Sequence, residues 1–135
     1  MKTVMAFGSF DIVHEGHKAY LQEAKSFGNH LIVVVARDSN IEKFKGRKPM
    51  HHEMERLMHV AELEMVDKAV LGHPDDILEV IEEYKPSILC LGYDQKTIDD
   101  KTLEKELQRR KVKAIIVRAK PFQPEKYKSS KFRIN

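Results

Sequence analysis

The sequence predicts an α/β fold, a single Rossmann-like domain built on a doubly wound parallel sheet of about five strands with helices on both faces. Apolar runs alternate along the chain with amphipathic segments, which is the pattern of strands alternating with helices. The run over residues 31–36, LIVVVA, is apolar at every position, as expected for a strand that helices cover on both sides. The connections between these elements are short, and crossovers between parallel strands are right-handed.

The first elements are a buried strand over residues 1–7 and an amphipathic helix over residues 17–27, followed by the strand at 31–36. The helix ends at Gly28-Asn29, a common pair at helix C-termini. Its apolar side chains recur at helical spacing and define the face that packs on the sheet: Tyr20, Leu21, Ala24 and Phe27.

The composition changes after the second strand. Residues 41–49, IEKFKGRKP, are basic and interrupted by glycine, so we expect a mobile loop there. A second helix is expected over residues 51–63 and a third strand over residues 66–71. Four side chains of this helix are expected to face the core: Met54, Leu57, Met58 and Ala61.

The second half of the chain continues the alternation. We expect a helix that begins at Asp75 or Asp76, a strand over 87–91, a helix that begins at Asp99 or Asp100, and a strand over 114–117. The last helix has few apolar positions and is therefore expected to lie largely exposed. Residues 118–135 are expected to form a loop and C-terminal tail, which leaves residues 1–135 as one domain.

Charge and cysteine content narrow the class of protein. The net charge of +3 is too small to indicate nucleic-acid binding by itself, and we expect no nucleic-acid partner. The single cysteine, Cys90, lies in an apolar run, which excludes a disulfide framework and fits a reducing, cytoplasmic location. No apolar run reaches membrane-spanning length, so we expect no membrane partner.

The stretch over residues 4–17, VMAFGSFDIVHEGH, predicts a phosphate-binding site. An apolar strand ends at Gly8, and His14, Gly16 and His17 come just before a helix. Glycine lets the backbone approach a ligand closely, and a helix N-terminus attracts anions. The glycine spacing fits neither the dinucleotide fingerprint nor a P-loop. The two histidines could also be metal ligands, but no cysteine or carboxylate cluster completes such a site, so phosphate is favoured and no metal ligand is assigned.

Four polar or glycine-containing segments follow strands of the predicted sheet: residues 8–17, 37–38, 72–75 and 92–94. Ligands of doubly wound sheets bind beyond the carboxyl ends of the strands, at the switch in strand order. We therefore expect these segments to converge on one edge and to form the binding site.

The motif GSFDIVHEGH resembles the GxFDxxHxGH signature of the nucleotidyltransferases related to cytidylyltransferases. Every fixed position is present: Gly8, Phe10, Asp11, His14, Gly16 and His17. Further matches to this family are Glu55-Arg56, Gly92 with Asp94, and Ser129-Ser130. The segments VVVARDS, GRKP, VDKAVLGH and LGYDQK look most like the small archaeal-type FAD synthases, which are similar to glycerol-3-phosphate cytidylyltransferases.

The resemblance implies transfer of a nucleoside monophosphate from an NTP to a phosphate-bearing acceptor, with Mg²⁺ accompanying the NTP and pyrophosphate leaving. His14, His17, Lys45 and Arg56 are the expected catalytic residues: the histidines donate to phosphates, Lys45 lies on a basic loop that closes over the triphosphate, and Arg56 contacts pyrophosphate. The expected nucleotide-binding positions are Gly8, Ser9, Phe10, Asp11, Gly16, Gly92, Asp94, Ser129 and Ser130. Phe10 would pack to hold the turn, and Asp94 would touch base or ribose.

Several alternatives remain open at this point. ATP with FMN, giving FAD, is the leading pair of substrates. CTP with glycerol 3-phosphate is the close rival, and a pantetheine-phosphate type of acceptor is the third. Two other classes of function stay open: a non-catalytic nucleotide-binding module and, more weakly, direct nucleic-acid binding. Arg56 could instead form an ion pair with Glu53 or Asp67, and Lys45 could simply be solvated.

The family resemblance also implies a homodimer. Only five residues follow Ser130, whereas the family continues into a full helix. The last wall of the site is therefore expected to be short or to come from a partner subunit. Three aromatic side chains could form a slot for a flavin ring: Tyr93, Phe122 and Tyr127.

Overall fold

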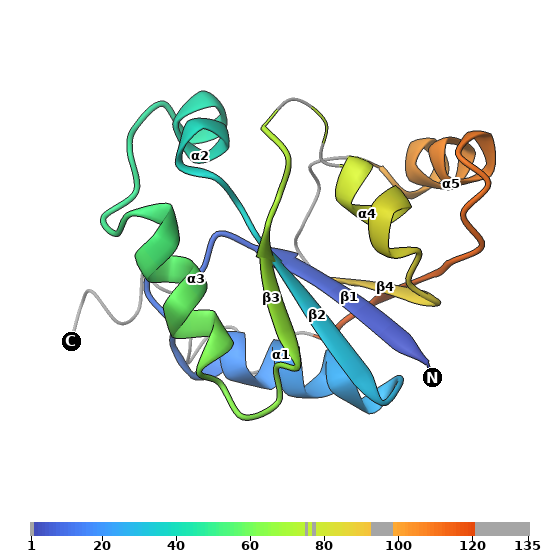
Figure 1. Ribbon diagram of the computed structural model, residues 1–135, viewed down its shortest axis with the longest axis horizontal. Helices are drawn as coiled ribbons and strands as arrows, with labels where there is room; N and C mark the ends of the chain where they lie inside the picture. The colour runs from blue at the N-terminus through green and yellow to red at the C-terminus, as the bar shows by residue number, and fades with distance from the viewer. Residues whose placement is uncertain (1, 75, 77, 93–98, 121–135) are drawn as a thin grey trace.

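Five parallel strands form one sheet in the order β3-β2-β1-β4-β5 (Figure 1). The computed structural model describes residues 2–74, 76, 78–92 and 99–120. The strands are β1 (Thr3–Gly8), β2 (His30–Val35), β3 (Lys68–Leu71), β4 (Ile88–Leu91) and β5 (Ile115–Arg118). The expected α/β architecture with a parallel sheet of five strands is confirmed.

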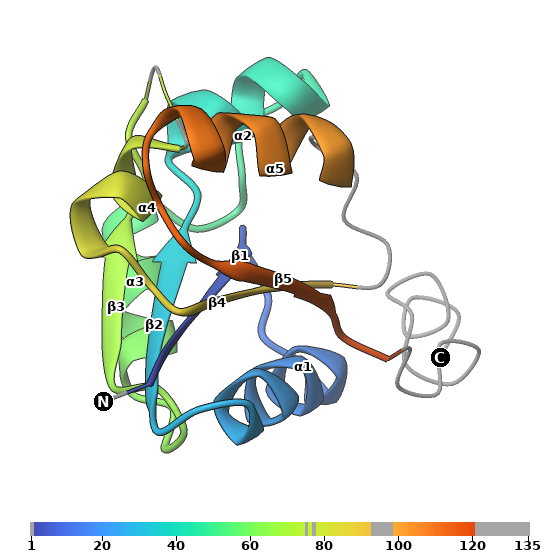
Figure 2. The ribbon, with the colours of Figure 1, turned by 90° about the vertical axis from the view of Figure 1, so that its right-hand side faces the viewer.

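Helices cover both faces of the sheet, as expected, and divide the core into two halves. On one face, α1 (Glu15–Ser26) and α3 (Glu53–Ala61) pack against the sheet. On the other lie α4 (Glu79–Tyr84) and α5 (Asp100–Arg109), so that α1 and α5 stand on opposite sides in Figure 2. Successive residues of β1 point to opposite faces, and Val4 and Ala6 therefore join the first half of the core while Met5 joins the second.

Cys90 in β4 is fully buried in the first half of the core, and burial raises the pKa of its thiol to about 12. This cysteine is thus a small apolar core residue, as its sequence context indicates. None of the helices in the described part of the chain combines the length and the apolar character needed to cross a membrane.

The structure corrects the expectation of a loop over residues 41–49. A further helix, α2 (Asp38–Lys45), occupies most of this stretch. Ile41 is buried and anchors the helix, and Gly46 ends it in a left-handed conformation with φ 72°, its N–H donating to the carbonyl of Glu42 at 2.8 Å. One apolar anchor and a glycine C-cap are sufficient for a helix of two turns, although its other side chains are polar or exposed.

The structure also corrects which side of α3 faces the core. Arg56 and Val60 are fully buried, and Leu57 packs against the core beside them. Three of the four expected core residues are exposed: Met54, Met58 and Ala61. The helix is rotated because the guanidinium of Arg56 has partners in the interior, which makes burial of that face favourable.

The reversal of strand order lies between β1 and β4. Pairing of β1 with β2 continues to Gly8 and Val35, whereas pairing of β1 with β4 ends at Ala6 and Cys90. The strands therefore separate at their carboxyl ends at this switch point, where doubly wound sheets bind their ligands.

Candidate active site

His14 and His17 come together at the start of α1. His14 is the N-cap residue, and its Nδ1 accepts a hydrogen bond of 3.0 Å from the N–H of Gly16. In return, the N–H of His14 donates to Nδ1 of His17 at 3.3 Å. The rings are stacked, with centroids 4.0 Å apart. Because both Nδ1 atoms accept hydrogen bonds, the proton of each neutral imidazole is on Nε2.

Both imidazoles are held neutral. Burial lowers the pKa of His17 to about 4. Repulsion from the protonated form of His14 and from Lys45 lowers it further, against a backbone hydrogen bond at Ile12 that raises it. Burial also lowers the pKa of His14, partly offset by the charge of Glu15. Near neutral pH the pair therefore consists of two uncharged N–H donors at a helix N-terminus, an arrangement suited to phosphate oxygens.

The turn between β1 and α1 is built around Phe10. This residue has a positive φ of 53°, its ring is almost completely buried, and it meets the ring of His17 edge-on with centroids 5.3 Å apart. A Cβ atom at Gly8 would lie 2.7 Å from the Phe10 ring. The space beside Gly8, which we expected to admit the nucleotide, is thus filled by Phe10, in keeping with the packing role expected of that ring.

Asp11 fastens this turn to the segment that precedes α3. Its two carboxylate oxygens accept hydrogen bonds from the N–H groups of Met50 (2.8 Å) and His51 (2.9 Å). Burial acts to raise the pKa of Asp11, but these two bonds and the charges of His51 and Arg56 outweigh it and the pKa is lowered. Asp11, expected among the nucleotide-binding residues, is therefore occupied in joining two loops.

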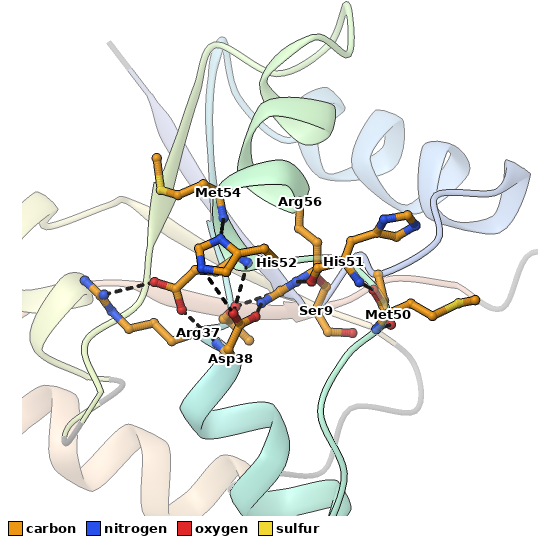
Figure 3. Close-up of polar contacts among 11 residues, drawn as sticks. Ser9, Arg37, Asp38, Met50, His51, His52, Met54 and Arg56 are labelled. Atoms are coloured by element: carbon orange, nitrogen blue, oxygen red, sulfur yellow. Dashed lines mark hydrogen bonds and ion pairs between the residues drawn. The ribbon is translucent and has the colours of Figure 1, made fainter.

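Arg56 extends from α3 to the same loops and bonds to them, as Figure 3 shows. Its Nη1 donates to the carbonyls of Ser9 (2.8 Å) and Ala36 (2.7 Å), its Nε donates to the carbonyl of His51 (3.0 Å), and its Nη2 donates to Oδ1 of Asp38 (2.6 Å). This side chain is fully buried, which favours a positioning role over the expected pyrophosphate contact. Neither alternative ion pair forms: Glu53 pairs with Arg37, and Asp67 pairs with Lys25.

Asp38 is the functional-site residue that sequence reasoning missed. It pairs with Arg56, and it also exchanges hydrogen bonds with Glu53: its N–H donates to Glu53 Oε1 (2.9 Å), and the N–H of Glu53 donates to its Oδ2 (3.2 Å). Neighbouring Arg37 donates to the carbonyl of Gly72 at 2.6 Å. The sequence signal for Asp38 is its position in a polar pair just after the apolar run of β2. That position predicts the binding edge of the sheet but no specific role for the side chain.

Lys45 lies on the exposed surface at the last turn of α2. Its positive charge contributes to lowering the pKa of His17. Lys43, Arg47 and Lys48 are also exposed along this stretch. The basic character of the segment is thus retained, although Lys43 and Lys45 belong to a helix and not to a loop.

Of the other expected positions, Gly92 follows β4, and its carbonyl accepts a hydrogen bond of 2.9 Å from Nη1 of Arg118. Asp94, Ser129 and Ser130 lie outside the described residues, as do the aromatic residues Tyr93, Phe122 and Tyr127. Across the described ranges, no group of three or more His, Cys, Asp or Glu side chains could hold a metal ion.

The chain is similar to several known proteins. The cytidylyltransferase-like family matches residues 5–135. An FAD synthase from Aciduliprofundum boonei is 47% identical over 90% of this chain and 80% of its own length. An FAD synthase from Archaeoglobus profundus is 45% identical over 96% of this chain and 82% of its own.

Two solved structures are also similar. A lipopolysaccharide core biosynthesis protein from Thermoplasma volcanium superposes with a TM-score of 0.86 at 43% identity, over 91% of this chain and 99% of that one. A pantoate-β-alanine ligase from Francisella tularensis, with a TM-score of 0.63 at 14% identity over 98% of this chain and 68% of that one, shares the fold.

Proposed function

This chain belongs to the cytidylyltransferase-like family, and we propose that it is an FAD synthase, which transfers AMP from ATP to the phosphate of FMN and releases pyrophosphate. The observation that carries the proposal is the identity of 45–47% to FAD synthases over nine-tenths or more of the chain. The paired N–H donors of His14 and His17 at the start of α1 support it chemically.

In this reaction an oxygen of the FMN phosphate attacks the α-phosphorus of ATP in line with the departing group. The new P–O bond forms as the bond to the bridging oxygen breaks, and the electron pair leaves with pyrophosphate. The acceptor supplies the nucleophile, so the protein has only to align the reactants and to stabilise charge on the phosphates. Nε2–H of His14, and Nε2–H of His17 in exchange for its backbone contact at Ile12, would donate to those oxygens. The helix dipole of α1 adds to the attraction.

Neutral donors suit this task because the pair does not change charge near neutral pH. The positive charge comes instead from α2 and the residues after it. Lys45 would neutralise the β- and γ-phosphates, with Lys43, Arg47 and Lys48 adding to the field. Arg56 and Asp11 would take no direct part, and would hold the loops on which the donors stand.

The remaining contacts belong to the same proposal. The backbone of Gly8, Ser9 and Gly16 would border the nucleotide, Gly92 and Asp94 would contact base or ribose, and Ser129 and Ser130 would bind phosphate. Mg²⁺ would arrive with ATP and be held chiefly by phosphate oxygens. That fits the described donor set, because the carboxylates of Asp11 and Asp38 already accept hydrogen bonds from protein groups. The protein would act in the cytoplasm as a homodimer. Sedimentation equilibrium would measure the mass of the assembly.

The deciding experiment compares two substrate mixtures with Mg²⁺ present. We expect pyrophosphate release and FAD formation from ATP with FMN, and neither pyrophosphate nor CDP-glycerol from CTP with glycerol 3-phosphate. Release only in the second mixture would replace both substrates while keeping the reaction class. If neither mixture releases pyrophosphate, and calorimetry still shows ATP binding, a non-catalytic nucleotide-binding module would be favoured.

A further inference from the structure

The hydroxyl group of Tyr20 joins two strands of the sheet. Tyr20 lies on α1 among the residues that pack on the sheet. Its hydroxyl donates to the carbonyl of Cys90 in β4 at 2.5 Å and accepts a hydrogen bond of 3.2 Å from the N–H of Phe7 in β1. A side chain that reads in sequence as part of an apolar helix face thus carries a polar contact to each of the two central strands.

The position of this hydroxyl along the strands is specific. The last paired residues of β1 and β4 are Ala6 and Cys90, and β1 goes on pairing with β2 for two further residues. The hydroxyl therefore contacts both strands at the point where they cease to pair. That point is the switch in strand order, where the crevice of a doubly wound sheet opens.

The end of β4 is held from its other side as well. Arg118 of β5 donates to the carbonyl of Gly92 at 2.9 Å and to Oδ1 of Asp100 at 2.8 Å. Burial raises the pKa of Tyr20 far above its ordinary value, so the hydroxyl keeps its proton and remains a donor to Cys90 at every physiological pH. Contacts from α1 and from β5 thus both hold the end of β4.

We propose that Tyr20 is a positioning residue for the nucleotide: its hydroxyl sets the separation between the ends of β1 and β4, and so places the Gly8 turn and Gly92 to receive the nucleoside part of ATP. The inference rests on the proposed function only in naming ATP. It concerns the nucleoside part of ATP, because the phosphates are assigned to the histidine pair and the basic segment.

The test is the Tyr20→Phe variant, which removes one oxygen and keeps the ring, compared with Tyr84→Phe as a matched control. Tyr84 lies on α4, packed against the opposite face of the sheet. We expect Tyr20→Phe to raise the KM for ATP about fivefold, the effect of losing a net hydrogen bond, while the KM for FMN and kcat stay within about twofold of wild type. Tyr84→Phe should leave all three values unchanged.

A lowered unfolding midpoint with an unchanged KM for ATP would overturn the inference and leave the hydroxyl a purely structural group. Titration calorimetry with Mg-ATP separates this outcome from failure of the proposed function. If wild type binds ATP but forms no FAD, the proposed function fails, while a weaker Kd in Tyr20→Phe still supports the positioning role. Should Tyr20→Phe not fold, Arg118→Lys loosens the second contact and carries the same expectation: a selective loss of ATP affinity, with equal affinity overturning it.

Discussion

Asp38 accepts a hydrogen bond of 2.6 Å from Arg56, whose side chain has 0% of its surface exposed. The other donors of this guanidinium reach carbonyls at the end of β1, just beyond β2, and just before α3. A buried charge with this many partners holds the loops in place, and removal of one partner is strongly destabilising because it leaves an uncompensated buried group.

Replacing Arg56 with Met should destabilise the protein by about 3–5 kcal/mol, because the Asp38 carboxylate and three carbonyls would lose their partner. Urea denaturation followed by circular dichroism measures the change. Arg109→Met is the control: Arg109 pairs with Glu106 at the surface and should contribute about 0–1 kcal/mol. A loss for Arg56→Met no larger than that of the control would contradict a positioning role.

Replacing His14 with Asn should separate its two tasks. Asn retains an acceptor for the N–H of Gly16 and therefore the N-cap, but it lacks Nε2–H. We expect kcat to fall by about 10²–10³-fold, with stability and the Kd for ATP little changed. His59→Asn, on the exposed side of α3, is the control. Unchanged turnover in His14→Asn would remove this imidazole from the reaction.

The histidine pair should make stability depend on pH. The pKa of His17 is depressed from 6.5 to about 4, so between these values the unfolded chain binds more protons than the folded one. Stability is therefore full above pH 6.5 and falls as the pH is lowered toward 4, by up to about 3 kcal/mol, which solvent access reduces. The pKa of His14 is also lowered by folding, so this residue likewise makes stability fall as the pH is lowered.

Denaturation curves at a series of pH values test this directly. In His17→Gln the slope between pH 6.5 and 4 should become shallower. Asp11 and Asp38 have lowered pKa values as well, and their contributions begin to be lost below about pH 5. Both carboxylates are retained in His17→Gln, so the difference between the two curves isolates the imidazole. An identical slope in wild type and His17→Gln would show that this imidazole is not held neutral by folding.

Introducing a methyl group at Gly8 should displace Phe10. The new Cβ would lie 2.7 Å from the aromatic ring, and the ring cannot withdraw easily because it is buried. Overpacking of this kind costs about 1–3 kcal/mol. In the double variant Gly8→Ala/Phe10→Leu, the penalty of the alanine should shrink, which thermal denaturation of the four members of the cycle would measure. Additive penalties would mean that the two positions do not compete for space.

Removing the charge of Lys45 should affect the reaction and its neighbour together. Lys45→Met should raise the KM for ATP several-fold without a change in stability, since the side chain is exposed. It should also raise the pKa of His17, because the lysine charge helps to depress it. Proton NMR titration of the imidazole follows the second effect, and Lys18→Met on α1 serves as the control. A pKa that does not move would separate Lys45 from the histidine pair.

The strands and most helices could be predicted from the sequence because each carries a local signal. The apolar runs of β1 and β2 and the glycine that ends β1 are local signals of this kind. The motif histidines were placed correctly for the same reason: their spacing across a helix start brings the side chains together.

The failures share one physical cause, namely partners distant in sequence. Arg56 is buried because it donates hydrogen bonds to two carbonyls that follow strands and to Asp38. The hydrophobic periodicity of the sequence gives no sign of these partners. The helix at residues 38–45 depends on the burial of Ile41, a tertiary contact that outweighs a basic, glycine-interrupted composition. The sequence predicts Tyr20 only as an apolar residue of the helix face. The hydrogen bonds of its hydroxyl to β1 and β4 depend on the tertiary structure.

The way Arg56 is bound has a consequence for the order in which the protein assembles. One side chain accounts for contacts to the turn after β1, to the end of β2 and to the start of α3, so none of these loops reaches its final path until all have arrived. Their amide hydrogens should therefore exchange with solvent as one cooperative unit, with a common opening free energy. The edge of the sheet that carries the histidine pair would thus open and close as one unit.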